Sequence, residues 1–124
     1  MLLHASLTGD IRAAAIEVHR TLGPGLLERV YEECLCEELA RRRVAFVRQL
    51  ALPIAYKGKQ LDCGFVIDLM VEDKVVLELK SVERVLPVHE AQLLTYLKLT
   101  GKRVGLLINF NTERLVDGVV RRVL

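Results

Sequence analysis

No apolar run in this chain approaches the roughly 20 residues that span a bilayer, so we expect no transmembrane helix. Residues 1–4 also lack the basic start and long apolar core of a signal peptide. Internal repeats, low-complexity tracts and evident linkers are absent as well. With 124 residues, the chain is predicted to form a single domain over residues 1–124.

Cysteine is scarce and odd in number, three residues, which argues against a disulfide framework and for a reducing cytoplasm. Cys34 and Cys36 lie two residues apart in a predicted helix. Their side chains therefore point about 200° apart and cannot bind one metal ion together. We interpret both, and Cys63, as small buried apolar residues.

Excess charge of either sign is nearly absent, because 18 Lys and Arg residues against 16 Asp and Glu residues give a formal net charge of +2. A charge this small does not by itself predict nucleic-acid binding, although it leaves room for a local basic face. The contents of hydrophobic residues, 52%, and charged residues, 27%, are typical of a globular rather than a disordered chain.

Apolar residues recur every three or four positions in some segments and every second position in others, which predicts a mixture of helices and strands. Gly23 and Gly25 interrupt the first helical pattern, and Pro87 and Gly101 bracket the last one. The predicted elements are helices at 8–22 and 26–42, strands at 44–57, 65–71 and 75–79, a helix at 88–100, and strands at 104–109 and 119–124.

Residues 68–80 are the most informative stretch, because a polar turn at 72–74 separates two apolar runs and predicts a β-hairpin. Glu78 and Lys80 lie two residues apart, hence roughly 7 Å apart on one face of the second strand. If the register brings Asp68 beside them, two carboxylates and one ammonium group converge. Alternation in the first strand predicts one face made of Phe65, Ile67, Leu69 and Val71 and another made of Val66, Asp68 and Met70.

Such a cluster suits divalent-metal chemistry. Mg²⁺ prefers hard oxygen ligands, usually one or two carboxylates together with water and substrate phosphate. The ion lowers the pKa of a bound water and neutralises charge that builds up on a phosphoryl group, and a nearby lysine stabilises the same charge. The alternative is that Asp68, Glu78 and Lys80 form a solvated strand face with a surface ion pair, because this spacing arises readily by chance.

The second predicted helix offers further polar candidates. Glu28 near its N-terminus either stabilises the helix dipole or supplies a third carboxylate to the cluster. Arg41 and Arg42, in a run of three arginines, either form a solvated helix end or contact phosphate. His19, near the end of the first helix, is interpreted as a structural hydrogen-bonding residue rather than a ligand.

The order of these elements, with acids on the second and third strands, resembles the core of the PD-(D/E)XK nuclease superfamily. It is more similar to one branch, the small bacterial GxxExxY proteins. The resemblance covers residues 11–110 and implies an α/β (α+β-like) fold with a central mixed sheet of four to five strands flanked by helices, in the order ααβββαβ(β). The blocks that carry it are Val18-His19, Gly23-Pro24-Gly25-Leu26-Leu27-Glu28-Arg29-Val30-Tyr31, Asp68-Leu69-Met70-Val71-Glu72, Glu78-Leu79-Lys80-Ser81, Gln92-Leu93-Leu94-Thr95-Tyr96-Leu97 and Gly105-Leu106-Leu107-Ile108-Asn109-Phe110.

Carried over residue by residue, the resemblance makes Asp68 and Glu78 the metal-binding acids and Lys80 the catalytic lysine. The main-chain carbonyl of Leu79 is expected to supply another oxygen to the metal ion. Glu28 corresponds to the acid that the first core helix offers in many members.

Gln92 and Tyr96 resemble the Gln-x-x-x-Tyr motif of the RecB-like exonuclease branch and are expected to contact substrate or water beside the metal. Two positions depart from the family's pattern. Val66 stands where the family often has a basic residue, and Ile67 replaces the proline of the superfamily's name. The first departure weakens the expected phosphate contact more than the metal site.

The resemblance implies hydrolysis of phosphodiester bonds in nucleic acid, with DNA favoured over RNA and with Mg²⁺ or Mn²⁺ as cofactor. The competing interpretation is a non-catalytic nuclease-like module that binds nucleic acid or a protein partner. The sequence leaves open whether such a module is a homodimer. The modest net charge and Val66 favour this second interpretation, and the complete set of two acids and a lysine favours the first. A structural domain with incidental charges is a third interpretation. We expect a cytoplasmic protein with no membrane partner.

Overall fold

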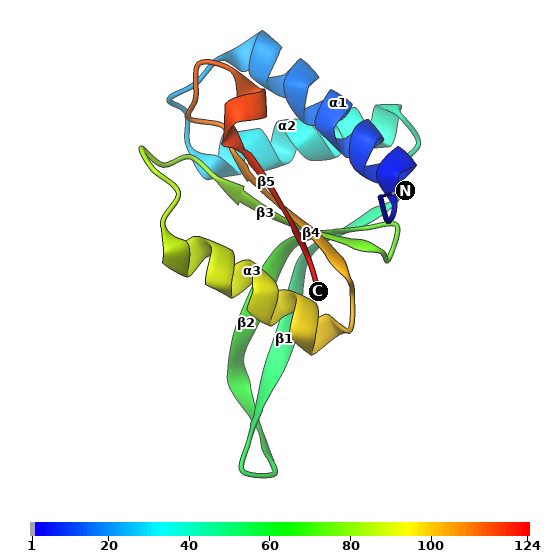
Figure 1. Cartoon of the computed structure of the whole chain (residues 1–124), viewed down its shortest axis with the longest axis vertical. Coiled ribbons are helices and arrows are strands. Elements are labelled where there is room, and N and C mark those ends of the chain that lie inside the picture. The colour runs from blue at the N-terminus through cyan, green and yellow to red at the C-terminus, as the bar shows by residue number, and fades with distance from the viewer. Residues whose placement is uncertain (1) are drawn as a thin grey trace.

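The strands of this computed structural model, which describes residues 2–124, form one sheet in chain order, β1-β2-β3-β4-β5 (Figure 1). β3 and β4 are parallel, and the other neighbouring pairs are antiparallel. Within residues 2–124 the predicted mixed sheet is therefore confirmed, with five strands. Met1, which begins the N-terminal segment considered above, lies outside the described residues. The strands are β1 (Phe46–Tyr56), β2 (Lys59–Val71), β3 (Val75–Lys80), β4 (Val104–Asn109) and β5 (Val119–Val123).

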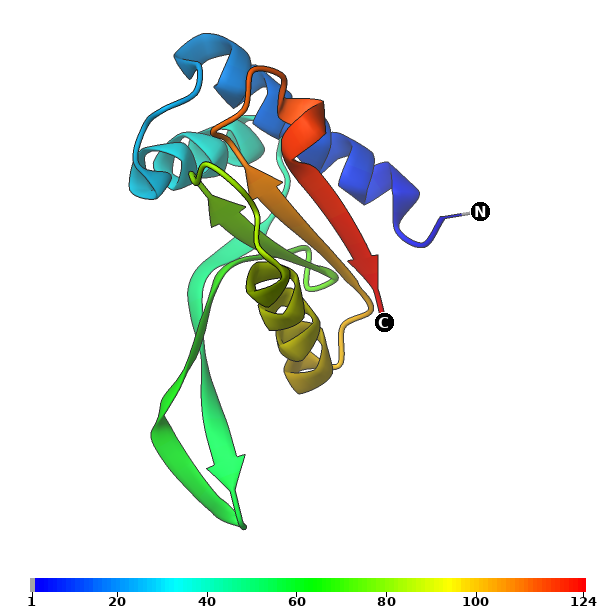
Figure 2. The same ribbon diagram turned by 60° about the vertical axis from the view of Figure 1, so that its left-hand side comes forward.

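Helices cover both faces of the sheet, as Figure 2 shows. On one face lie α1 (Ala5–Leu22) and α2 (Glu28–Arg41), and on the other lies α3 (Pro87–Thr100), while the short 3-10 helix η1 (Leu115–Gly118) precedes β5. The predicted helices begin and end within three residues of these bounds. None of the helices in residues 2–124 is long and apolar enough to cross a membrane.

β4 lies at the centre of the core and is buried on both faces, as its unbroken apolar sequence predicts. Leu106 and Ile108 belong to the cluster that packs under α1 and α2. Leu107, between them, belongs to the cluster under α3. Because β3 pairs with β4 in parallel along its whole length, from Val75–Val104 to Lys80–Asn109, the candidate residues of β3 rest on the most deeply buried strand.

The alternation of side chains in β2 breaks at Asp68, contrary to the expectation of two regular faces. Leu69 packs under α1 and α2, whereas Ile67 packs under α3, although both were expected on one face. Gln49 of β1, opposite Asp68, has a left-handed backbone with φ of 49°, and the β1–β2 register has no Gln49–Asp68 pair. This irregularity turns Asp68 to the α2 side of the sheet, away from the face of Met70 on which it was predicted.

β1 and β2 continue far beyond the rest of the sheet as a two-stranded ribbon, residues 50–67, which we call the arm (Figures 1 and 2). β2 begins at Lys59, six residues before the predicted start. The register shifts between Leu52 and Ile54, where Pro53 of β1 faces a bulge of three residues, 62–64, in β2. Gly64 lies in this bulge, and a Cβ atom there would overlap the Leu52 carbonyl.

The arm overturns one expectation from the sequence. Cys63 lies in this ribbon and is exposed, so its interpretation as a buried residue is wrong. The reason is that its strand leaves the sheet and has no helix packed over it. Cys36 is buried as expected, and Cys34 is half-buried.

Tyr31 fixes the turn that joins α1 to α2. Its ring is fully buried and stacks on Phe110 with 4.5 Å between ring centroids. Its hydroxyl donates to the Gly23 carbonyl at 2.6 Å and accepts from the Leu26 N–H at 3.1 Å. His19, at the end of α1, lies with Nε2 2.7 Å from the Thr112 carbonyl oxygen, which is the structural role predicted for it.

Replacing Tyr31 by Phe should lower the free energy of unfolding by about 1 kcal/mol, because two hydrogen bonds of the turn are lost while the stacked ring is kept. Urea unfolding followed by circular dichroism measures the change. Tyr56→Phe is the matched control, since that side chain is 60% exposed and should leave stability unchanged. Equal effects of the two substitutions would refute this role of the Tyr31 hydroxyl.

Candidate active site

The candidate site forms where β2 and β3 separate. The ladder between them comprises three residue pairs and ends at Leu69–Leu77. Beyond it, the Asp68 N–H donates to Glu78 Oε1 at 3.2 Å, and the Leu79 N–H donates to Asp68 Oδ2 at 2.8 Å. Two carboxylates thus take over the hydrogen bonds that the ladder would otherwise make, and each is fixed to the opposite strand.

The two carboxylates reach this gap from different faces of the sheet. Asp68 lines a pocket on the α2 side. Glu78 lies between Leu77 and Leu79, which both pack under α1 and α2, so its side chain leaves β3 on the α3 side. Asp68 lies opposite Glu78, so the register meets the condition for a shared cluster, but the expected common face is not found.

The main-chain carbonyl of Leu79 points into the same gap. In a strand, the N–H and C=O of one residue point to the same edge, and successive residues point to opposite edges. The Phe110 N–H donates to the Lys80 carbonyl at 2.9 Å, so Lys80 is turned to β4. Leu79 is therefore turned to β2, as its N–H bond to Asp68 also shows. Its carbonyl oxygen is therefore directed into the gap, where the family resemblance implies a metal ligand.

The surroundings of the two acids disfavour their ionised forms. Burial, followed by the charge of Asp68, raises the pKa of Glu78 to about 8, and only 4% of the Glu78 residue surface is exposed. Burial also raises the pKa of Asp68. The Lys80 ammonium lowers both pKa values without offsetting burial. Lys80 forms no ion pair within 4.0 Å with any acid of residues 2–124, so a surface ion pair does not explain this cluster.

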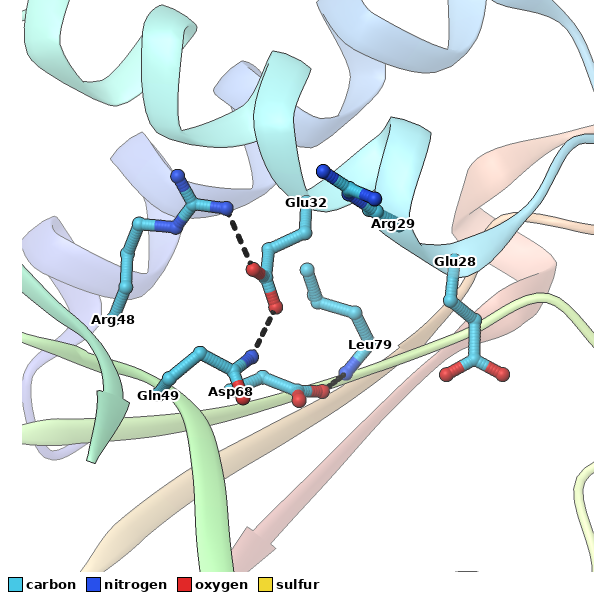
Figure 3. Close-up of a pocket in the computed structure, with 7 residues that line it drawn as sticks. All are labelled: Glu28, Arg29, Glu32, Arg48, Gln49, Asp68 and Leu79. Carbon is cyan, nitrogen blue, oxygen red and sulfur yellow. Dashed lines mark hydrogen bonds and ion pairs between the residues drawn. The ribbon is translucent and has the colours of Figure 1, made fainter. Parts of the chain in front are cut away.

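A pocket of about 390 Å³ opens beside Asp68 on the α2 side, and Figure 3 shows its residues. Glu32 is held there by Arg48 and by Gln49, each at 2.7 Å. The pocket is lined by Glu28, Arg29, Glu32, Arg48, Gln49, Asp68 and Leu79.

Glu28 lines this pocket as the first residue of α2, with an exposed side chain. In the described part of the chain, no three His, Cys, Asp or Glu side chains form a group that could hold a metal ion. The expected convergence of Glu28 with Asp68 and Glu78 is therefore not found. The oxygen donors at the gap are the two carboxylates and the Leu79 carbonyl, which is a fitting set for Mg²⁺, because this ion normally keeps several water ligands.

The structure does not bring Arg41 and Arg42 to the pocket. They form ion pairs with Glu37 and Glu38 at 2.8 Å, one helical turn earlier in each case. At 1.5 Å per residue they lie roughly 20 Å along α2 from its first residue. Arg29 takes their place, since it lines the pocket, is exposed and makes no ion pair within residues 2–124. Its position in the first turn of α2, next to Glu28, is the sequence signal by which Arg29 could have been found.

α3 brings Tyr96 to the other side of the acid pair. The Tyr96 ring packs edge-on against Phe65, with centroids 5.4 Å apart, and is almost fully buried. Burial, then the charges of Glu78 and Asp68, raises the pKa of Tyr96 to about 12. Gln92 lies half-buried one turn earlier on the same helix. Gln92 and Tyr96 are four residues apart on α3, and this helix covers the face of the sheet from which Glu78 reaches the gap.

Asn109 and Ser81 hold the chain that follows Lys80, and sequence reasoning missed both roles. Asn109 is buried at the end of β4, where its side chain accepts from the Val82 N–H at 3.0 Å and donates to the Val82 carbonyl at 2.9 Å. Ser81 Oγ donates to the Leu26 carbonyl, which ties the end of β3 to the turn before Glu28. A polar residue at the end of a fully buried strand is the sequence signal by which Asn109 could have been found.

Comparison with known proteins gives one match. A family model described as the PD-(D/E)XK nuclease superfamily matches residues 5–123. Members of this superfamily are typically nucleases and generally use divalent metal ions. No match is found among curated proteins or among solved structures.

Replacing Glu78 by Gln should stabilise the protein at alkaline pH in the absence of divalent ions. The pKa of Glu78 is raised from 4.5 to about 8, so between these values the folded protein keeps a proton that the unfolded chain has lost. Wild-type stability therefore falls as pH rises through this window, and the neutral Gln escapes the loss. At pH 9 the gain should be about 1 kcal/mol or more, since one pKa unit corresponds to roughly 1.4 kcal/mol.

Urea unfolding of wild type and variant at pH 4, 6, 8 and 9 measures this difference. The two proteins should agree at pH 4 and diverge above it. Glu113→Gln, which changes an exposed residue in the loop after β4, should follow the wild type at every pH. A Glu78→Gln curve parallel to the wild type would show that Glu78 ionises normally.

Proposed function

The chain belongs to the PD-(D/E)XK nuclease superfamily, and on that basis we propose that it hydrolyses phosphodiester bonds of DNA with a divalent metal ion, Mg²⁺ or Mn²⁺. We assign it to the GxxExxY branch on the block from Gly25 to Tyr31. The proposed active site is the gap between β2 and β3 together with the pocket beside it.

One observation carries the proposal: two acids on neighbouring strands, Glu78 buried and Asp68 half-buried, each accept a main-chain hydrogen bond from the other's strand, with no cation paired to either within residues 2–124. Burying two such charges side by side is unfavourable unless a positive group joins them. Asp68, Glu78 and the Leu79 carbonyl would hold a metal ion. When bound, the ion would lower the pKa of a water molecule and neutralise charge on the phosphate.

The protein's own side chains have distinct tasks in this proposal. Lys80, at the end of β3, stabilises the negative charge that develops on the phosphate oxygens. Glu28, across the pocket, accepts a proton from the attacking water or orients it. Arg29 contacts a phosphate of the substrate from the first turn of α2. Gln92 and Tyr96 contact substrate from the α3 side.

A second candidate function is supported by a specific observation. Glu28 does not join the acid pair, and a site with fewer acidic ligands favours a nuclease-like module that binds nucleic acid without cleaving it. Such a module would keep the fold and the Asp68–Glu78 bonds but would show no turnover. Metal binding and cleavage therefore have to be measured separately.

Mg²⁺, and in a second series Mn²⁺, should raise the melting temperature of the wild type and fail to raise that of Asp68→Asn or Glu78→Gln. At about 100-fold excess over Kd, ligand binding adds about 2.7 kcal/mol, which corresponds to several degrees. Thermal unfolding with and without the ion, and titration calorimetry, measure binding. Glu113→Gln should respond like the wild type. Equal shifts in all four proteins would place the ion elsewhere.

Lys80→Met should reduce DNA cleavage at least about 100-fold. The melting temperature, and its increase when Mg²⁺ is added, should stay nearly unchanged. The assay uses linear double-stranded, single-stranded and branched DNA with Mg²⁺ or Mn²⁺. Lys74→Met, in the exposed turn between β2 and β3, is the matched control and should cleave normally. If the wild type binds metal and cleaves none of these substrates, the non-catalytic module is the better description.

A further inference from the structure

The arm is long, exposed and supported by no third strand. From Leu50–Ile67 to Tyr56–Lys59 it consists of β1 and β2 alone, since β3 pairs only with residues 69–71 of β2. Its base is anchored, because Leu50, Leu52 and Phe65 pack against the cluster under α3. Its outer half extends beyond the helices (Figures 1 and 2). A two-stranded ribbon is only marginally stable in water, so a partner that orders it is expected.

The tip of the arm combines two cations with an exposed aromatic ring. Lys57 and Gly58 form its turn with φ of 50° and 81°, a conformation that usually selects Asn, Asp or Gly at the first position. Lysine thus occupies a position that local geometry disfavours. Neither Lys57 nor Lys59 makes an ion pair with an acid in the described part of the chain. Tyr56 is 60% exposed, and Lys57 Nζ lies 5.5 Å from its ring centroid.

The β1 edge of the arm is unsuited to another β-strand. Pro53 removes one N–H donor from β1, and the bulge opposite it in β2 makes the ribbon irregular. Such features disfavour strand addition at the β1 edge. Two unpaired lysines instead complement the phosphate backbone of a nucleic acid, and the major groove of a duplex is wide enough for a two-stranded ribbon.

The base of the arm is the candidate active site itself. Gln49, at the irregularity of β1, lines the same pocket as Asp68. Lys59 lies nine residues before Asp68 along β2, and because the bulge takes up two of these residues the separation is at most roughly 30 Å at about 3.3 Å per residue. Duplex DNA rises 3.4 Å per base pair, so this length corresponds to at most about nine base pairs.

We propose that the arm lies along the duplex bound at the active site and that Lys57 and Lys59 contact its phosphates within about nine base pairs of the Asp68–Glu78 pair. The inference rests on the proposed function, because it needs a nucleic acid at that pair. It adds a length requirement: a short duplex leaves the tip without a phosphate to contact, whereas a long duplex engages both lysines. The arm thereby selects extended double-stranded substrate over short or single-stranded substrate.

The test measures binding of fluorescently labelled DNA duplexes of 8 and 24 base pairs by anisotropy, in EDTA and over a range of salt concentrations. Lys57→Gln/Lys59→Gln should weaken binding of the longer duplex about tenfold and lower its salt slope by about 2, since each phosphate contact contributes about 0.9. The same variant should bind the 8-base-pair duplex as the wild type does. Arg12→Gln/Lys74→Gln, which removes two exposed cations on α1 and in the β2–β3 turn, is the charge-matched control and should match the wild type on both duplexes.

Three results would overturn the inference. Equal binding of the longer duplex by Lys57→Gln/Lys59→Gln and by the charge-matched control would show that the arm makes no contact. Cleavage by the wild type in the same experiment would leave the proposed function intact. Conversion of a wild-type dimer to a monomer by the arm substitutions, seen by analytical ultracentrifugation, would assign the arm to a second copy of the chain. A wild type that neither binds nor cleaves any duplex with Mg²⁺ would overturn the proposed function and the inference together.

Discussion

The candidate site depends on two hydrogen bonds across the gap: Glu78 accepts one from the Asp68 N–H, and Asp68 accepts the other from the Leu79 N–H. At the point where β2 and β3 separate, main-chain N–H groups would lose their partners in the interior, at a cost of about 1–3 kcal/mol each. The two carboxylates satisfy these groups and allow the strands to open without an unpaired donor. The same bonds hold both acids in place before any ligand arrives. Structure and the proposed chemistry therefore use the same atoms, and in the proposed function the cost of ionising both acids is offset by the metal ion that joins them.

The remaining layers of the fold bring further groups to this gap. On one side, the Tyr31 hydroxyl and Ser81 hold the turn from which α2 begins, so that Glu28 and Arg29 lie at the pocket. On the other side, α3 packs Tyr96 against Phe65 near Glu78. A change in either helix would therefore alter the approach to the acids without touching them. Asn109 completes the arrangement by fixing the chain just beyond Lys80.

Local patterns in the sequence predicted most of the architecture. The helices, the buried β4 and the opposition of Asp68 to Glu78 follow from periodicity and from the short turn at 72–74. The faces around Asp68 were predicted wrongly, because regular alternation takes no account of the left-handed Gln49 on the neighbouring strand. The expectation that Cys63 is buried failed because nothing in its own strand shows that the sheet ends before it. Arg41, Arg42 and Arg29 carry identical side chains, and only the start of α2 relative to the sheet decides which of them faces the pocket.

The parallel pairing of β3 with β4 has a consequence for the order in which the site matures. A parallel partner can be reached only through a crossover, and here α3 and its connections separate Lys80 from Val104. Contacts between segments so far apart in the chain form late, because the intervening loop must be closed first. Asp68, Glu78 and Lys80 are all made before residue 104, yet β3 gains its buried neighbour only after the ribosome has added β4. A chain that stops before β4 thus carries every acidic group of the site without the strand that supports β3, and the site is complete only after β4 has been added.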